Sequence, residues 1–145
     1  MLLGQIEGKL SKKHQVALPK EFRVELGETV IVTKGFKTYL QIVAKKNWEV
    51  LLEGTKGKPF TDQGTRDLQR FLFGNAVEVR LDTQVRMLIP DFLRRHAKLD
   101  KKVIFVGIER YVELWDVKEF QQYDATVAKA PELLTINLSK TQGHE

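Results

Sequence analysis

A basic segment between Gly8 and Lys20 carries the side chains best suited to binding a polyanion. Its lysines, which face no acidic residue in the segment, are Lys9, Lys12, Lys13 and Lys20. His14 adds a further cation when it is protonated. Ammonium groups clustered in this way attract phosphates and raise the local concentration of an acidic partner. The segment therefore predicts either a nucleic-acid contact or a solvated surface loop, and its charge alone does not choose between them.

The excess positive charge of the chain lies in its first part. The 145 residues carry a formal net charge of +5. Residues 1–60 hold 11 Lys or Arg and 6 Asp or Glu, whereas residues 61–145 hold 13 of each kind. We therefore expect a polyanion to bind the first half more strongly than the second.

An internal repeat with a spacing of about 71–73 residues places the basic segment on a hairpin. Residues 4–19 and 75–90 both show alternating apolar residues, a short polar loop, a second alternating run and a proline. Alternation with a period of two on both sides of a loop is typical of a β-hairpin with one buried face. The basic segment thus occupies the loop of the first hairpin, and residues 82–86 occupy the loop of the second.

The segments after the two prolines also match. Residues 19–27 and 90–97 are typical of one or two helical turns, because proline suits the first helical position and Gly27 suits a helix end. Short apolar runs, turns and amphipathic segments follow in both copies. We expect strands at 30–32, 39–43, 103–106 and 111–115, and short helices around 48–52 and 117–123.

These elements predict an α+β fold, mainly β, in which the two copies pair into one pseudo-two-fold barrel. Four short strands cannot bury both of their faces alone, whereas two copies can share one core. A linker helix is expected from about Thr65 to Phe73, ending at Gly74. We assign residues 1–53 to the first copy, 54–74 to the linker loop and helix, 75–123 to the second copy, and 124–145 to a loosely ordered C-terminal tail in which a short helix could form around 131–134.

Four further motifs occur in a fixed order along the chain. They are the opening Met1-x-x-Gly4, the inter-repeat segment QRFLFGNA at 69–76, the loop Asp82-x-x-x-Arg86 before Pro90, and the segment YVELWD at 111–116. Their order and spacing resemble those of the MraZ family, bacterial regulators with two tandem SpoVT–AbrB-like repeats, and the similarity extends from Met1 to about Tyr123. The resemblance implies an AbrB-like swapped-hairpin barrel and a ring-like homo-oligomer. It also implies a DNA-binding transcription factor that recognises short G-rich direct repeats upstream of the division and cell-wall gene cluster.

The first loop departs from the D-x-x-x-R pattern that the family carries in both copies. Ser11 and Gln15 stand where the pattern has Asp and Arg. Arginine is the commonest side chain to contact guanine, through its bidentate fork, whereas glutamine prefers adenine. We therefore expect DNA contacts with an altered or relaxed sequence preference from Lys9, Lys12, Lys13, His14, Gln15 and Lys20.

Asp82 and Arg86 allow two interpretations. They form either a second DNA-facing loop or a structural pair in which Asp82 accepts loop N–H groups and holds Arg86 in place. We favour the structural pair, because residues 61–145 are neutral overall. The basic run at 94–96 is interpreted as a solvated or subunit-contacting helix face, and Trp48 and Trp115 as core residues.

The sequence lacks the motifs of enzymes, metal-binding proteins and membrane proteins. The chain has no cysteine, and its three histidines lack the spacing of a metal site. Since no phosphate-binding glycine loop or nucleophile motif is present either, we expect no catalysis, no metal and no cofactor. No apolar run reaches the roughly 18 residues of a membrane span, and the start lacks the features of a signal peptide. We expect a cytoplasmic, nucleoid-associated protein.

The expected partners are double-stranded DNA and further copies of the chain, with no membrane and no small-molecule substrate. Two alternatives remain open at this stage. One is an oligomeric protein-interaction module whose DNA-binding loop has decayed, which the residues Ser11 and Gln15 motivate. The other is an AbrB-like antitoxin that occupies a toxin with its C-terminal tail.

Overall fold

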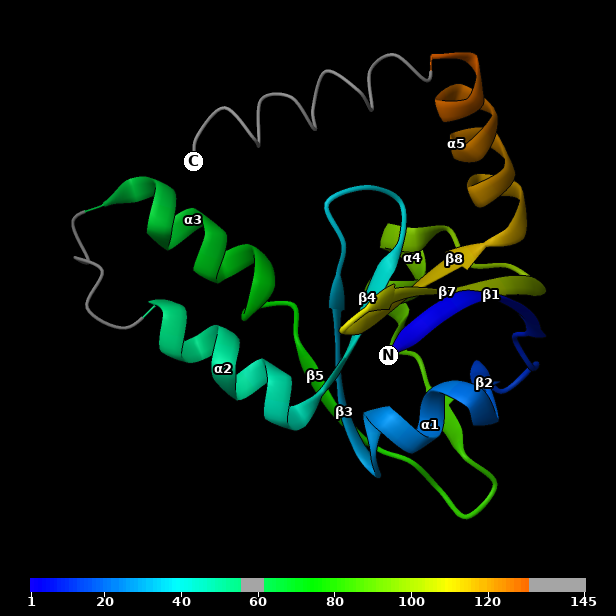
Figure 1. The fold of residues 1–145 in the computed structure, drawn as a ribbon, viewed down its shortest axis with the longest axis horizontal. Helices are drawn as coiled ribbons and strands as arrows, with labels where there is room; N and C mark the ends of the chain where they lie inside the picture. The colour runs from blue at the N-terminus through cyan, green and yellow to red at the C-terminus, as the bar shows by residue number, and fades with distance from the viewer. Residues whose placement is uncertain (56–61, 131–145) are drawn as a thin grey trace.

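An open, six-stranded antiparallel sheet dominates the computed structural model, which describes residues 1–55 and 62–130 (Figure 1). The order of its strands is β1 (Leu2–Lys9), β7 (Lys102–Glu109), β8 (Tyr111–Asp116), β4 (Leu40–Ala44), β3 (Thr29–Lys34) and β5 (Val77–Arg80). A separate two-stranded ribbon pairs β2 (Gln15–Ala17) with β6 (Arg86–Leu88). In the part of the chain that the structure describes, β1 and β5 form the two edges of the sheet, so no closed barrel forms.

The two copies exchange strands. β1 of the first copy pairs with β7 of the second, and β5 of the second pairs with β3 of the first. The ribbon takes one strand from each copy. When the two copies are interchanged, the same strand order results in reverse, so the fold has a pseudo-two-fold axis. The predicted α+β fold, mainly β and built from two copies, is confirmed.

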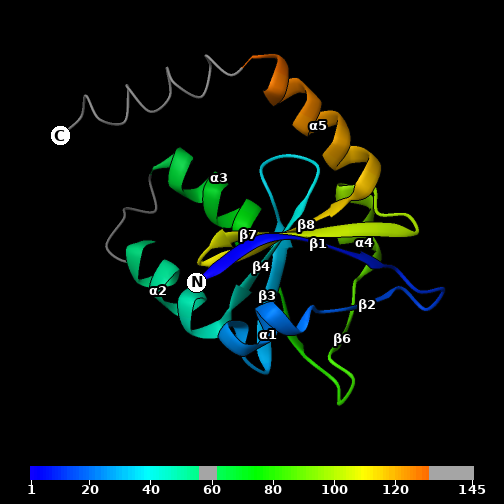
Figure 2. The same ribbon diagram turned by 45° about the vertical axis from the view of Figure 1, so that its right-hand side comes forward.

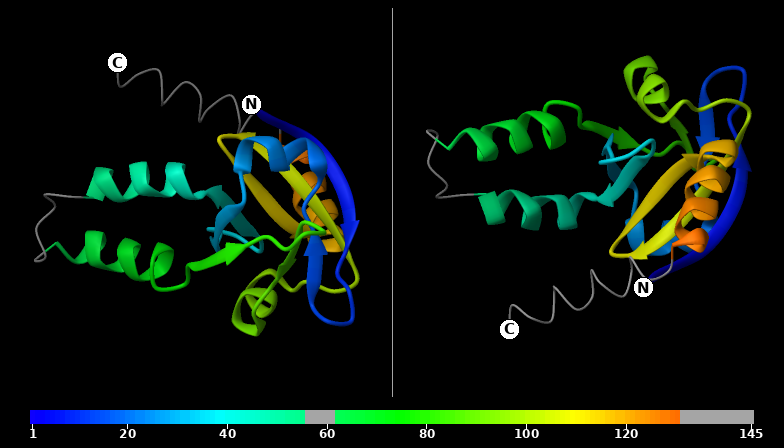
Figure 3. Two further views of the ribbon diagram at one scale, coloured as in Figure 1. Left: turned by 90° about the horizontal axis from the view of Figure 1, so that it is seen from below. Right: turned by 90° about the horizontal axis from the view of Figure 1, so that it is seen from above.

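Four helices of the described ranges lie between strands, and the last helix follows β8. They are α1 (Lys20–Leu26), α2 (Lys45–Thr55), α3 (Gln63–Leu72), α4 (Asp91–Ala97) and α5 (Val117–Lys129). α1 and α4 follow Pro19 and Pro90 directly, and each presents two buried side chains to the core. α1 ends at Gly27, whose φ of 82° glycine adopts without steric cost. α2 and α3 lie side by side and project from the sheet (Figures 1 and 3).

The main core contains side chains of both copies. The inward-facing residues of the ribbon and its flanks are at most 3% exposed; they are Val16, Leu18, Met87 and Ile89. They belong to one cluster with buried residues of the central strands, such as Leu40, Ile42, Phe105 and Leu114. Burial of each such side chain stabilises the fold by roughly 1.5–3 kcal/mol. Since both copies line this core, neither can bury its apolar face alone.

Three helices differ in length from the sequence-based expectation. α2 and α3 start earlier than expected, and Asp62 caps α3 by accepting a hydrogen bond from the N–H of Thr65. α5 continues through Asp124 to Lys129, where a loosely ordered tail was expected. Within the expected range, its side chains Phe120 and Tyr123 pack on the buried Trp115; beyond that range, the hydroxyl of Thr126 donates to the carbonyl of Gln122 one turn earlier. The short helix expected around 131–134 lies outside the described residues.

Candidate nucleic-acid interface

The β2–β6 ribbon has a loop at each end (Figure 2). We name residues 11–14 loop 1 and residues 82–85 loop 2. The N–H of Leu18 donates to the carbonyl of Val85 at 2.9 Å, and the N–H of Ile89 donates to the carbonyl of His14 at 2.9 Å. Each loop is therefore anchored by the strand of the other copy, as the pseudo-two-fold axis requires.

One face of the ribbon is exposed. Val16 and Met87 point into the core with exposures of 1% and 0%, and the alternation of a strand turns their neighbours outward. The outward positions are Gln15, Ala17, Arg86 and Leu88, with Gln15 opposite Leu88 and Ala17 opposite Arg86. Gln15 and Arg86 are equivalent under the pseudo-two-fold axis, so they share this face.

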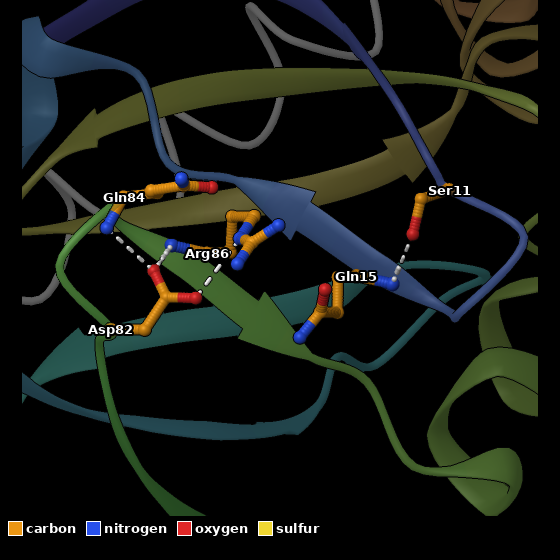
Figure 4. A network of polar contacts seen from close by, with 5 residues as sticks. All are labelled: Ser11, Gln15, Asp82, Gln84 and Arg86. Atoms are coloured by element: carbon orange, nitrogen blue, oxygen red, sulfur yellow. Dashed lines mark hydrogen bonds and ion pairs between the residues drawn. The ribbon is translucent and has the colours of Figure 1, made fainter.

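Ser11 closes loop 1. Its Oγ accepts a hydrogen bond from the N–H of Gln15 at 3.1 Å (Figure 4). Its carbonyl accepts one from the N–H of His14 at 2.9 Å. His14 has a φ of 64°, in the left-handed region that histidine enters more readily than most residues. The turn therefore forms without the aspartate of the D-x-x-x-R pattern, and Lys12 and Lys13 are exposed at its tip.

Asp82 closes loop 2 with more contacts. Its Oδ1 accepts hydrogen bonds from the N–H groups of Gln84 at 2.8 Å and Arg86 at 2.9 Å, and its Oδ2 pairs with Nε of Arg86 at 2.9 Å (Figure 4). These bonds, above all the one from the N–H of Arg86, hold the pKa of Asp82 below its usual value. Asp82 thus accepts loop N–H groups and holds Arg86, whose side chain is 44% exposed. These contacts orient Arg86 on the outward face of the ribbon.

The structure groups five of the six predicted contact residues. Lys9 ends β1, Lys12, Lys13 and His14 lie in loop 1, and Gln15 begins β2. Lys20 does not join them. It begins α1, beyond the end of β2 that contacts loop 2.

The basic run after Pro90 is engaged within the molecule. Asp91 pairs with Arg94 at 3.3 Å and with Arg95 at 2.9 Å along α4. Nε2 of His96 lies 2.9 Å from the carbonyl oxygen of Lys37 in the first copy. Because a carbonyl oxygen only accepts, Nε2 carries the hydrogen of this bond. The run therefore supports α4 and its contact with the turn between β3 and β4.

Two other kinds of feature are absent from the described ranges. Within residues 1–55 and 62–130, no group of three or more His, Asp or Glu side chains could hold a metal ion. In the same ranges, no helix has the length and apolar character needed to cross a membrane.

A family model described as "MraZ protein, putative antitoxin-like" matches residues 1–71 and 72–133. The chain belongs to the MraZ family. Each matched stretch contains one of the two copies, and the family indicated by the sequence motifs is confirmed.

Curated relatives named "Transcriptional regulator MraZ" cover most of the chain. The protein of Caldanaerobacter subterraneus subsp. tengcongensis is 40% identical over 123 residues, which are 85% of this chain and 86% of the relative. That of Carboxydothermus hydrogenoformans is 41% identical over 123 residues, with the same coverage. That of Desulforamulus reducens is 35% identical over 138 residues, 95% of this chain and 97% of the relative.

The strand exchange of this MraZ chain also brings together residues that the sequence analysis did not connect. Lys102 of the second copy lies opposite Lys9, and Lys101 follows beside Leu10 at the base of loop 1. The signal was present in the sequence as a Lys-Lys pair ahead of an apolar strand. Its position became apparent only with the register of β1 against β7.

Proposed function

We propose that this protein is a transcriptional regulator that binds double-stranded DNA through loop 1 and the outward face of the β2–β6 ribbon. The observation that carries the proposal is the exposed tip of loop 1, where Lys12, Lys13 and His14 stand on a turn fixed by Ser11. Among the residues that the structure describes, no carboxylate forms an ion pair with Lys9, Lys12 or Lys13. The names of the curated relatives support the same function.

Each outward side chain has a distinct task in this proposal. Lys12 and Lys13 contact phosphates, and the ribbon enters a groove in the manner of β-ribbon DNA-binding proteins. Arg86, held by Asp82, contacts guanine, whereas Gln15 at the equivalent position contacts a base edge with a preference for adenine. One half of the ribbon therefore keeps the guanine-recognising fork and the other lacks it.

The proposal extends to assembly and targets. Copies of the chain form a ring-like homo-oligomer whose loops engage successive short G-rich boxes upstream of the division and cell-wall gene cluster. Each subunit binds weakly, and the linked loops supply affinity by raising the effective concentration of the next contact. Boxes about 10 bp apart present the same side of the duplex to successive loops. Such a regulator works in the cytoplasm, on the nucleoid.

Fluorescence anisotropy with a labelled duplex of tandem G-rich boxes, and with its scrambled control, tests the proposal across a salt series. Wild-type protein should prefer the box duplex and show a steep salt dependence. Lys12→Ala/Lys13→Ala should abolish binding at physiological salt, while light scattering shows unchanged assembly. Lys46→Ala/Lys129→Ala is the matched control, because it removes two exposed charges from α2 and α5. Loss of assembly with unchanged DNA binding in the loop variant would refute the role of loop 1.

A second function is favoured by one specific observation, the glutamine at position 15. Without an arginine fork, the loop could serve an oligomeric protein-interaction module or an antitoxin, and the matching family model is itself described as antitoxin-like. Absence of binding to both duplexes at low salt, with intact assembly, would select this alternative.

A further inference from the structure

We infer that the second copy completes the phosphate-binding site of loop 1 through Lys101 and Lys102. The inference rests on the proposed function and enlarges its binding surface. In the β1–β7 ladder Lys102 lies directly opposite Lys9, and the N–H of Leu10 donates to the carbonyl of Lys101 at 2.9 Å. Residues directly opposite in antiparallel strands have Cβ atoms about 4.5–5.5 Å apart. The base of loop 1 is therefore a composite of both copies.

The equivalent position beside loop 2 has a different charge. There Arg80 lies opposite Thr29, and the N–H of Leu81 donates to the carbonyl of Glu28 at 3.0 Å. Glu28 and Thr29 thus occupy, beside loop 2, the places that Lys101 and Lys102 occupy beside loop 1. Because both loops have matching anchoring bonds to the opposite strand, charge distinguishes their two ends more than backbone shape does.

The two ends of the ribbon differ strongly in net charge. Residues 9–15 with 100–102 hold five lysines and one aspartate, a net charge of +4 with His14 neutral. Residues 80–86 with 27–29 hold two arginines, one aspartate and one glutamate, a net charge of zero. The excess at loop 1 attracts a polyanion, whereas the end at loop 2 is electrostatically balanced.

The lysines at loop 1 are available to an external anion. Lys101 and Lys102 are exposed, and within residues 1–55 and 62–130 neither forms an ion pair. The nearest acidic residues along the chain, Glu7 and Asp100, are exposed and form no ion pair with them in the same ranges. Like charges placed directly opposite in a ladder, such as Lys9 and Lys102, repel each other. A phosphate between them relieves that repulsion.

The fitting ligand is the sugar–phosphate backbone of the duplex bound by the ribbon, since ammonium groups recognise phosphate without recognising sequence. The unequal charge also gives the subunit a direction. A pseudo-symmetric ribbon alone would dock equally well in two orientations along a groove. With phosphate affinity concentrated at one end, one orientation is favoured, which suits boxes repeated in the same direction.

Salt dependence of DNA binding tests the inference on the full chain. Each phosphate contact contributes about −0.9 to the slope of log affinity against log salt. Lys9, Lys12 and Lys13 alone predict a slope of about −2.7 per engaged subunit, and adding Lys101 and Lys102 predicts about −4.5. Lys101→Ala/Lys102→Ala should reduce the steepness by about 1.8 per engaged subunit, equally on the box duplex and the scrambled duplex. Lys101→Arg/Lys102→Arg, which keeps the charge, and the control Lys46→Ala/Lys129→Ala should retain the wild-type slope.

The outcomes separate this inference from the function on which it rests. An unchanged slope in Lys101→Ala/Lys102→Ala, with binding lost in Lys12→Ala/Lys13→Ala, overturns the inference and leaves the proposed function standing. An equal decrease of the salt slope in the alanine and arginine variants also overturns the inference, because the effect then does not depend on charge. If the wild-type protein binds neither duplex, the inference and the proposed function are both overturned.

Discussion

Ser11 and Asp82 occupy equivalent positions in the two loops, and each side chain accepts a hydrogen bond from the backbone N–H four residues later. The oxygen–nitrogen distance is 3.1 Å from Ser11 to Gln15 and 2.9 Å from Asp82 to Arg86. A hydroxyl thus closes the turn as a carboxylate does. What the serine lacks is the second oxygen, which in loop 2 binds the guanidinium of Arg86. The two loops therefore share a turn and differ in the side chain that the turn can hold.

Removing the closing side chain should affect loop 2 more than loop 1. Asp82 accepts two backbone hydrogen bonds and pairs with Arg86, whereas Ser11 accepts one bond. Ser11→Ala should lower the free energy of unfolding by about 0.5–1.5 kcal/mol, and Asp82→Ala should lower the Tm by more than Ser11→Ala does. Thermal unfolding followed by circular dichroism measures both. Loss of DNA affinity in Asp82→Ala without a lower Tm would contradict the structural role of the pair.

The contribution of Asp82 should vanish in acid. Because hydrogen bonds hold the pKa of Asp82 below its usual value, folding favours the ionised carboxylate. That contribution is complete above the pKa of the unfolded chain, about 3.9, and is lost as the pH falls through the lower pKa of the folded state. The difference in Tm between wild type and Asp82→Asn should be constant from neutral pH to about pH 5 and shrink below about pH 4. A difference that disappears near pH 6 would implicate another group.

Restoring the missing arginine should sharpen recognition of guanine. Gln15 lies on the outward face at the position equivalent to Arg86, and Ser11 stands where Asp82 holds that arginine. Ser11→Asp/Gln15→Arg should improve discrimination between the G-rich duplex and its scrambled control by about 1–3 kcal/mol, measured by anisotropy. Gln15→Lys is the control, since it adds charge without the fork. Equal gains on both duplexes would show that only charge had been added.

Loop 2 should acquire phosphate affinity when the charge of the neighbouring Glu28 is reversed. Glu28→Lys gives the base of loop 2 the charge that Lys101 gives loop 1. The salt slope should steepen by about 0.9 per engaged subunit. Glu49→Lys on α2 changes the net charge by the same amount and should leave the slope unchanged. Identical slopes in both variants, steeper than in wild type, would mean that total charge and not its place controls binding.

The aromatic stack of Tyr39, Trp115 and Tyr123 should stabilise the second half of α5. The ring of Trp115 stacks on Tyr39 at 4.8 Å and on Tyr123 at 5.2 Å between centroids. Tyr123→Ala should lower the free energy of unfolding by about 0.5–1.5 kcal/mol and expose one face of the Trp115 indole. A red shift of tryptophan emission together with faster amide exchange in residues 124–129 would report the change. Val127→Ala on the same helix is the control, because the stack does not include it.

The internal repeat made much of the fold predictable from the sequence. Period-two alternation located the hairpin strands, and Pro19, Pro90 and Gly27 marked the helices α1 and α4. Strand exchange was expected only through the family resemblance, since alternation specifies which face is buried and not which strand is the neighbour. The packing of Phe120 and Tyr123 on Trp115 is a tertiary contact, which a local sequence pattern does not predict.

The candidate site was predictable to the same extent. Loop 1 stands out because its lysines lie close together in the chain, and closeness along the chain alone places Lys20 with them. The structure separates Lys20 from loop 1 and brings Lys101 and Lys102 to it, because β2 leads away from loop 1 and β7 begins beside it. Local charge density predicts a site within one segment, whereas a composite site depends on register.

The exchange of strands between the copies has a consequence for the history of the gene. Duplication usually frees one copy to accumulate changes while the other preserves the ancestral role. In this chain each loop is anchored by the opposite copy and shares a strand ladder with it, so selection on one loop acts on codons in both halves. The two halves are therefore inherited as one unit of selection. A compensating mutation for a defect in loop 1 should be sought in the second half of the gene.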